Sequence, residues 1–337
     1  MTLQDQLEAY LARTWDTPVT VLDLSRIPGG ASRETYRFDV VAGGETRGMI
    51  LRRDPVGSLI DTSRRLEFEA IRSFAGTGLP APEAVALEEE GAELERPFFI
   101  MGRIDGGKAA SPFSQPPYGE HARAIGEQFF GHLGAIAEPD PLALPIAAVV
   151  DSPTPETCWK RELDYWEGVI DQDEEHPQPI VRACIRRLRG SPPPPAAKLS
   201  VVHGDYRTGN FLHDGAGKIL AILDWEMAHI GDPLEDLGWA VEPLWCYGET
   251  DRVSGMLPRA EAIALWEAAS GLTVDPVAFA WWELFASVKG AAIWISSAKE
   301  YRKGGFRDPV LGLSGWYTAR RQDQILADRL AALEALA

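Results

Sequence analysis

The chain has 337 residues, a net charge of −17 at neutral pH, 45% hydrophobic residues and 25% charged residues. These values fit a globular protein built as one elaborated domain or two lobes, and they exclude a fibrous or disordered chain. The acidic balance disfavours nucleic acid as a partner, because neutralising phosphates requires a basic surface.

We expect the protein to stay in the cytoplasm, with no membrane partner. No apolar run reaches the roughly 20 residues that cross a bilayer. Residues 1–16 have the pattern of an amphipathic helix and lack the basic start and apolar stretch of an export signal. Cys158, Cys184 and Cys246 form no CxxC pair, which suits a reducing compartment.

The first part of the chain carries strand signals on both sides of one helix. A helical spacing of apolar residues covers 62–74, and two strand-like runs follow at 83–87 and 97–103. A stretch rich in glycine and proline begins at Asp105, so we expect a first lobe of residues 1–103. Ahead of the helix, three runs rich in β-forming residues predict a β-meander over 19–27, 35–41 and 46–53.

The second part of the chain is mostly helical in its periodicity. Residues 118–137 and 157–189 each have the pattern of a helix, and the prolines of 191–195 predict a stiff connector because they cannot continue one. Helical spacing dominates again after Pro233. We expect a second lobe of residues 104–337, and an α+β fold for the whole chain.

The densest polar cluster, residues 203–210, reads HGDYRTGN and lies between apolar runs, with Asp224 further along the chain. Polar residues between buried strands require a chemical reason. Phosphoryl transfer supplies one, because a carboxylate orients the attacking hydroxyl while an amide and a second carboxylate hold Mg²⁺ against the nucleotide phosphates. Asp205, Asn210 and Asp224 offer these groups.

The HGDxxxxN pattern of residues 203–210 resembles the catalytic loop of the aminoglycoside phosphotransferase and choline kinase-like family, relatives of the protein kinases. The resemblance implies a bilobal, protein-kinase-like fold: a small antiparallel sheet lobe with one main helix, and a larger, mostly helical lobe. It also implies an enzyme that uses ATP and Mg²⁺.

The same resemblance assigns roles within the loop. Asp205 would be the catalytic base, and Arg207 falls where kinases place a phosphate-contacting lysine. Asn210 and Asp224 would be the Mg²⁺ ligands, which is enough protein for an ion that also binds phosphate and water. His203 would brace the loop rather than react.

Two features follow the loop. Glu226 is either an outer hydrogen-bond acceptor or a substrate contact. Residues 231–237 read GDPLEDL and also match the family, and here Asp232, Pro233 and Glu235 predict a helix start that resembles a capping box.

In the first lobe the resemblance implies a nucleotide site. Gly30 and Ser32 lie in a glycine turn that would cover the phosphates. The following strand lacks the kinase lysine, and an arginine stands in for it. Strand alternation lets only one of Arg52 and Arg53 face the cleft, and the resemblance to related sequences that read VLR here favours Arg52.

The remaining nucleotide contacts follow from the same pattern. Glu67 aligns best as the carboxylate that pairs with the strand cation, and Glu69 stays open as an alternative. Met101 lies in the strand that leads to the hinge, where backbone groups would meet the adenine.

The acceptor is expected to be a small molecule with a hydroxyl group, aminoglycoside-like, choline-like or hydroxyacyl. Tryptophans that accumulate after Pro233 are mostly core, although some could line its pocket. Glu242, Glu249 and Asp251 are candidates to bind a polyamine. The whole pattern looks more like the kinase-like modules found alongside acyl-CoA dehydrogenases, which would imply a hydroxylated acyl thioester.

Two other hypotheses remain open. The missing strand lysine and the poor glycine loop suit a nucleotide-binding regulatory module without catalysis. The other is a metal-dependent hydrolase, although no HExxH or HxxEH spacing supports it. Its candidate residues are His203, Asp205, His213, Asp214 and His229.

Overall fold

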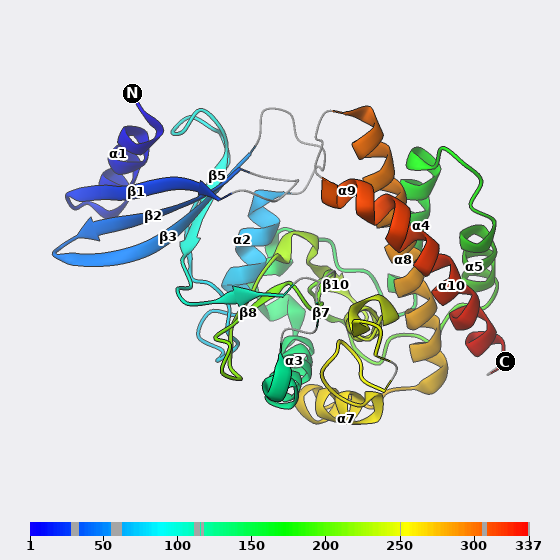
Figure 1. Cartoon of the computed structure of the whole chain (residues 1–337). Helices are drawn as coiled ribbons and strands as arrows, with labels where there is room; N and C mark the ends of the chain where they lie inside the picture. Colours follow the sequence, from blue (N-terminus) through cyan, green and yellow to red (C-terminus); the bar gives the residue numbers. More distant parts are fainter. Residues whose placement is uncertain are drawn as a thin grey trace.

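The computed structural model of the chain has two lobes, a sheet lobe at one end and a mostly helical lobe at the other (Figure 1). This confirms the bilobal, kinase-like α+β fold. The structure describes residues 1–27, 34–54, 63–110, 115, 118–249, 251–304 and 309–335.

A five-stranded antiparallel sheet forms the first lobe, with the strand order β1-β2-β3-β5-β4. Helix α1 begins at a capping box made by Thr2 and Asp5. The elements of this lobe are α1 (Leu3–Trp15), β1 (Val19–Ile27), β2 (Glu34–Ala42), β3 (Glu45–Arg53), α2 (Arg64–Ser73), β4 (Ala84–Glu88) and β5 (Phe98–Gly102).

The two faces of this sheet have different neighbours. Met49 and Leu51 of β3 join the apolar core that includes Leu7 of α1. Because successive side chains of a strand point to opposite faces, Arg52 points away from that core, toward α2. Of the two neighbouring arginines of β3, Arg52 and Arg53, Arg52 thus lies on the side of the second lobe.

The second lobe combines two small sheets with a helical bundle. Strand β7 pairs with β10, and β8 lies between β6 and β9. Its strands are β6 (Lys108–Ala109), β7 (Ser200–Val202), β8 (Phe211–His213), β9 (Ile219–Ile222) and β10 (His229–Gly231). Its helices are α3 (Ala122–Ala137), α4 (Cys158–Asp173), α5 (Pro179–Gly190), α6 (Leu234–Ala240), α7 (Arg259–Ser270), α8 (Pro276–Lys303), α9 (Pro309–Leu313) and α10 (Ala319–Glu334).

The single helix predicted over 157–189 is wrong, because the chain forms α4 and α5 there. Pro177 and Pro179 lie at the break. A proline inside a helix removes a hydrogen bond and clashes with the preceding turn, whereas Pro179 is well suited to the first turn of α5.

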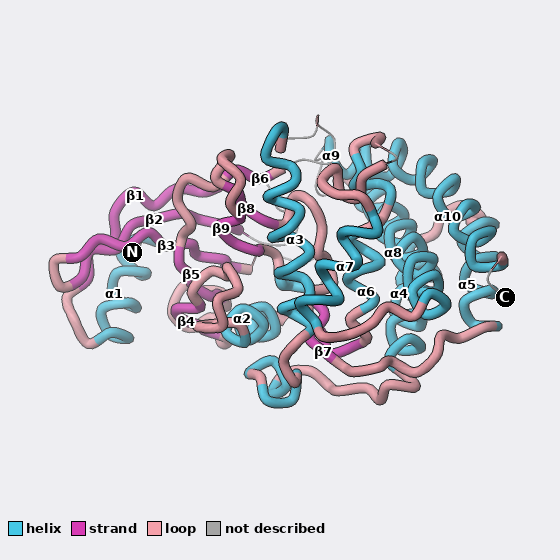
Figure 2. The backbone as a smooth tube through the Cα atoms, turned by 90° about the horizontal axis from the view of Figure 1, so that it is seen from below, coloured by secondary structure: helices cyan, strands magenta, loops and turns pink. Residues whose placement is uncertain are grey.

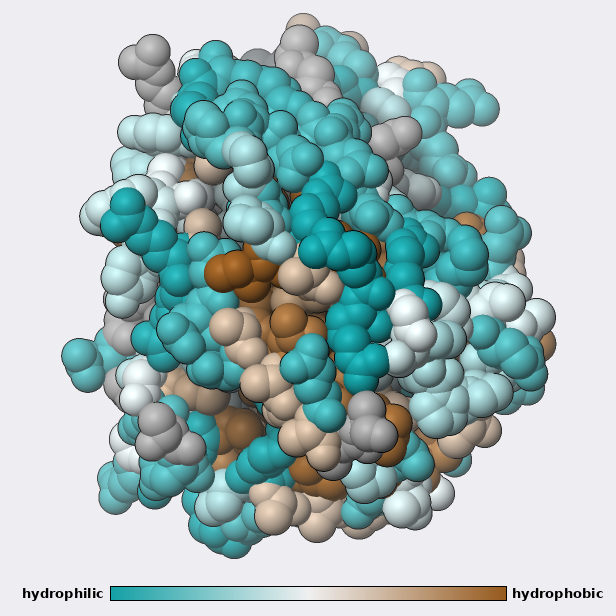
Figure 3. Space-filling view, turned by 90° about the vertical axis from the view of Figure 1, so that its right-hand side faces the viewer, coloured by the Kyte–Doolittle hydropathy of each residue, from teal (hydrophilic) through white to brown (hydrophobic). Residues whose placement is uncertain are grey.

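Helix α8 is the central element of the helical lobe. It contacts α4, α5, α6 and α10, and these helices gather at the end of the molecule opposite the sheet (Figure 2). That end shows a strip of apolar surface bordered by hydrophilic side chains (Figure 3). Among the described residues, no helix combines the length and the apolar character needed to cross a membrane.

Glu242 is a fully buried carboxyl in this lobe. It accepts hydrogen bonds from the Ser287 hydroxyl (2.9 Å) and the Gln322 amide (2.9 Å). Burial raises the pKa of Glu242 to about 7. Its position inside the core rules out the direct substrate contact considered for this residue.

We predict that Glu242→Gln changes the pH dependence of stability. Between its unfolded pKa of 4.5 and a folded pKa of about 7, the wild-type carboxyl is protonated only in the folded state. Wild-type stability therefore falls as pH rises through this window, by up to about 1.4 kcal/mol per pH unit. The variant lacks this term, so its Tm relative to wild type should rise from pH 5 to 7 and then level off. A Tm difference that is independent of pH would contradict the prediction.

Candidate active site

Gly204 sets the course of the loop that follows β7. Its φ is 84°, and a Cβ at this position would lie 2.3 Å from the Met227 carbonyl oxygen. The Asp236 carboxylate accepts the backbone N–H groups of His203 (2.5 Å) and Gly204 (2.9 Å). The backbone conformation, the crowding and a buried carboxylate together fix this turn.

His203 is buried beneath the loop. Its Nδ1 accepts the Asp205 backbone N–H (3.1 Å), so its Nε2 carries the proton and donates to the Leu223 carbonyl (2.9 Å). Burial lowers the pKa of His203 to about 4, which keeps the ring neutral at physiological pH. The ring ties the loop to the end of the segment that precedes Asp224, as expected for a bracing residue.

The Asp205 carboxylate accepts three hydrogen bonds. Its Oδ1 accepts from Arg207 Nε (3.1 Å) and Trp239 Nε1 (2.8 Å), and its Oδ2 accepts from Asn210 Nδ2 (2.6 Å). The side chain is 14% exposed. Asp205 is therefore held in one orientation while an edge of it stays accessible, which is what a group that accepts a proton from a bound hydroxyl requires.

Asn210 and Asp224 lie on the same side of this loop. The Asn210 amide nitrogen is used by Asp205, so the amide oxygen is the atom available to a cation. The Leu223 backbone N–H donates to the Asn210 carbonyl (2.8 Å), which places Asp224 next to it. Asp224 has a left-handed backbone (φ 68°), and its side chain is 38% exposed.

Arg52 is a residue of the first lobe that contacts this site. Its guanidinium pairs with Glu67 of α2 and lies 3.5 Å from both the Asp224 and the Glu226 carboxylates. These carboxylates hold the pKa of Arg52 above its ordinary value despite its burial. The ion pair with Glu226 supports the view of that residue as an outer acceptor.

The alternative residues of the first lobe lie elsewhere. Arg53 pairs with Glu34 (2.8 Å), and its side chain is on the opposite face of the sheet from Arg52. Glu69 pairs with Arg72 on its own helix (2.8 Å). Strand alternation thus favours Arg52 over Arg53 for the cleft, and the ion pairs on α2 favour Glu67 over Glu69 as its partner.

These side chains line a pocket of about 210 Å³ between the lobes, to which Arg52, Glu67, Met101, Asn210 and Asp224 all contribute. A larger pocket of about 1000 Å³ adjoins it, because both are lined by Met101 at the end of β5. Gly30 and Ser32 lie outside the described residues.

The residues of the smaller pocket fit a magnesium nucleotide. Asn210 and Asp224 offer the oxygen atoms that Mg²⁺ prefers. Arg52 Nε is buried and has no hydrogen-bond partner among the described residues. A buried donor of this kind calls for an acceptor, and a phosphate oxygen would supply one.

The segment after Asp224 departs from its prediction in one respect. Asp232 does help to start α6, by accepting the Leu234 N–H (2.9 Å). However, Glu235 does not close a capping box. It pairs with Lys289 (3.0 Å) and His229 (3.1 Å), so a buried charge cluster replaces the predicted cap.

Sequence reasoning counted Trp239 among the mostly core tryptophans, without a role at Asp205, and did not name Lys289. Trp239 lies three positions after Asp236 on α6, so one helix supplies both the carboxylate under the loop and the indole that binds Asp205. Lys289 lies inside an apolar stretch of α8, and a charge in such a stretch is the signal that could have marked it.

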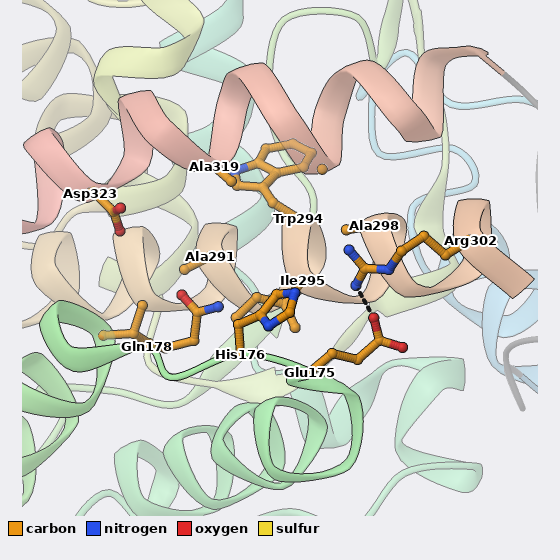
Figure 4. Close-up of a pocket in the computed structure, with 12 residues that line it drawn as sticks. Glu175, His176, Gln178, Ala291, Trp294, Ile295, Ala298, Arg302, Ala319 and Asp323 are labelled. Atoms are coloured by element: carbon orange, nitrogen blue, oxygen red, sulfur yellow. Dashed lines mark ion pairs between the residues drawn. The ribbon is translucent and has the colours of Figure 1, made fainter.

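A separate pocket of about 120 Å³ lies on the other side of α8 (Figure 4). Its floor is apolar, with Trp294 and Ile295 of α8, and the Glu175 and Arg302 ion pair crosses its rim. The candidate catalytic and metal-binding residues do not line it.

We predict that Arg52→Met weakens nucleotide binding by about 10- to 100-fold, because a charged hydrogen bond contributes about 1.5–3 kcal/mol. The matched control is Arg53→Met, since Arg53 belongs to the same strand and also loses an ion pair. Titration with a fluorescent ATP analogue should show a Kd close to wild type for this control. Equal effects of the two variants would contradict the assignment of Arg52.

In a comparison with known protein families, residues 23–272 match the Phosphotransferase enzyme family. The chain is 25% identical over 246 residues to acyl-CoA dehydrogenase family member 11 of Gallus gallus, covering 71% of this chain and 31% of that protein. It is 26% identical over 258 residues to viomycin phosphotransferase of Streptomyces vinaceus, covering 74% and 80%. The chain thus spans less than a third of the acyl-CoA dehydrogenase relative.

Solved structures share the fold. A Ralstonia eutropha protein assigned as an aminoglycoside phosphotransferase superposes with a TM-score of 0.75 at 22% identity, over 96% of this chain and 97% of that one. A ternary complex of aminoglycoside phosphotransferase APH(4)-Ia with AMP-PNP and hygromycin B gives a TM-score of 0.61 at 18% identity, over 96% and 98%. Since the family match covers most of the chain, this protein belongs to the Phosphotransferase enzyme family.

Proposed function

We propose that the protein transfers the γ-phosphoryl group of ATP to a hydroxyl group of a small molecule. The observation that carries this proposal is the junction of the two lobes, where Asp205 is bonded to Asn210 while Asn210, Asp224 and Arg52 line one pocket. Acid–base, metal-binding and phosphate-binding groups are thereby adjacent, which is the arrangement that phosphoryl transfer requires.

Each residue has a role in this reaction. Asp205 orients the acceptor hydroxyl and accepts its proton, and Arg207 beside it stabilises charge on the transferred group. Asn210 and Asp224 would hold Mg²⁺, which neutralises charge on the β- and γ-phosphates when bound. Arg52, aligned by Glu67, binds the α- and β-phosphates.

The remaining nucleotide contacts come from the first lobe. Gly30 and Ser32 would cover the phosphates, and Met101 would lie against the adenine, an assignment supported by its position on the wall of both pockets. A lobe boundary after residue 103 is supported by the end of β5 at Gly102 and by the pairing of β6 with β8 of the second lobe. Three free, buried cysteines among the described residues support a cytoplasmic site of action.

Two alternatives receive less support. The missing strand lysine and the poor glycine loop were the reasons to consider a module without catalysis. The ion pair of Arg52 with Glu67 supports Arg52 as the substitute for the lysine, whereas the glycine loop lies outside the described residues. The hydrolase hypothesis built its metal site on five residues, His203, Asp205, His213, Asp214 and His229. Both ring nitrogens of His203 form hydrogen bonds with backbone groups. Among the described residues, the side chains that could hold a metal ion together with His229 are Glu162 and Glu235.

The test is a phosphorylation screen with labelled ATP or GTP, since solved neighbours include complexes with AMP-PNP and with GDP. Acceptors would be aminoglycosides, choline-like amino alcohols and hydroxyacyl thioesters, the last motivated by the acyl-CoA dehydrogenase relatives. We expect a phosphorylated product, detected by mass spectrometry, in one class.

We predict that Asp205→Asn lowers kcat by roughly 10²- to 10⁴-fold, the usual contribution of a general base. The control, Asp328→Asn, makes the same change on the exposed part of α10 and should leave kcat unchanged. No transfer to any acceptor, together with an ATPase background that Asp205→Asn does not reduce, would overturn the proposal.

A further inference from the structure

We propose that Lys289, supported by Glu235 and His229, is a positioning residue that aims Asp205 by holding the Gly204 carbonyl. The inference rests on the proposed function, because it assigns Asp205 the catalytic role. It concerns residues that lie beneath the loop and touch neither pocket.

The Lys289 ammonium is enclosed in the protein. It is 1% exposed, and it donates to the Gly204 carbonyl (2.5 Å) and to Glu235 Oε1 (3.0 Å). It also lies over the rings of Trp166 (5.5 Å) and Trp239 (5.6 Å). A buried ammonium with these partners has one fixed position, unlike a surface lysine.

Glu235 and His229 compensate this charge. Glu235 lies between the Lys289 ammonium and His229 Nε2 (3.1 Å), and Glu162 is 3.6 Å from the same ring nitrogen. His229 Nδ1 contacts the Met227 carbonyl (3.0 Å), so both ring nitrogens face oxygen atoms and the ring is an imidazolium. Two carboxylates thus face the two buried cations, and Arg161 at the edge of the cluster also pairs with Glu162 (2.9 Å).

The cluster acts on the loop through Gly204. Asp236 holds the Gly204 N–H, while Lys289 holds its carbonyl, the oxygen of the peptide bond that joins it to Asp205. The Met227 carbonyl, against which Gly204 packs, is itself fixed by His229.

A second path reaches Asp205 through Trp239. The indole that lies beside the Lys289 ammonium donates its N–H to Asp205 Oδ1. Losing the ammonium would free both the peptide bond and the indole that orient this carboxylate. A displacement of about 1 Å at a reacting group can cost roughly 100-fold in rate.

The test compares Lys289→Met with Lys299→Met. Lys299 lies on the same helix, and its ion pair with Asp173 (2.8 Å) is remote from the loop. We expect Lys289→Met to lower kcat by roughly 10- to 100-fold while the KM for ATP changes less than about twofold. Lys299→Met should leave both unchanged.

Glu235→Gln/Lys289→Met separates positioning from folding. Lys289→Met alone removes one buried positive charge and leaves Glu235 with His229 as its remaining ion-pair partner, so it should lower Tm. The double variant removes one charge of each sign and should recover Tm. The proposal predicts that kcat stays low in the double variant. Recovery of kcat together with Tm would overturn it.

Hydrogen exchange makes the test independent of the proposed function. In Lys289→Met, amides of residues 203–210 should exchange roughly tenfold faster, with no change in α3 or the first lobe. Unchanged exchange in this loop would overturn the anchoring itself. If Lys289→Met exchanges faster but the wild-type protein transfers no phosphate, the proposed function is overturned and the anchoring stands.

Discussion

The peptide units on either side of Gly204 are the constraint on which the site depends. Asp236 accepts the N–H groups of His203 and Gly204, and Lys289 donates to the Gly204 carbonyl, so opposite charges hold the backbone here. The positive φ of Gly204 and the nearby Met227 carbonyl leave no room for a side chain. Because Asp205 is the next residue, contacts in the core fix the orientation of its carboxylate. A catalytic group placed by rigid packing needs little reorganisation when a substrate arrives.

The site also depends on ion pairs between the two lobes. Arg52 belongs to the sheet, yet its guanidinium is balanced by Glu67 of α2 and by Asp224 and Glu226 of the second lobe. Three carboxylates around one arginine leave local negative charge that a metal ion would relieve. Nucleotide and metal binding would therefore rearrange the charges that join the two lobes.

Much of this could be predicted from the sequence. The spacing of HGDxxxxN pointed to the loop, and the family resemblance favoured Arg52 over Arg53, of which strand alternation lets only one face the cleft. The helix break at Pro177 and the role of Glu235 were missed for physical reasons. Helical periodicity continued across the prolines, and a capping box has the same residues as a buried ion pair. The charge of Lys289 within an apolar stretch could have marked it, but its role could not be assigned, because its partners Gly204 and Glu235 are distant in sequence.

The most direct measurement of the account is calorimetric titration with ATP in the presence and absence of Mg²⁺. The account predicts Mg²⁺-dependent binding to the wild type, its loss in Asp224→Asn, and its retention in Asp205→Asn, since Asp224 would hold the metal and Asp205 would not. Binding that does not depend on Mg²⁺ in the wild type, or that survives unchanged in Asp224→Asn, would contradict the assignment of this site.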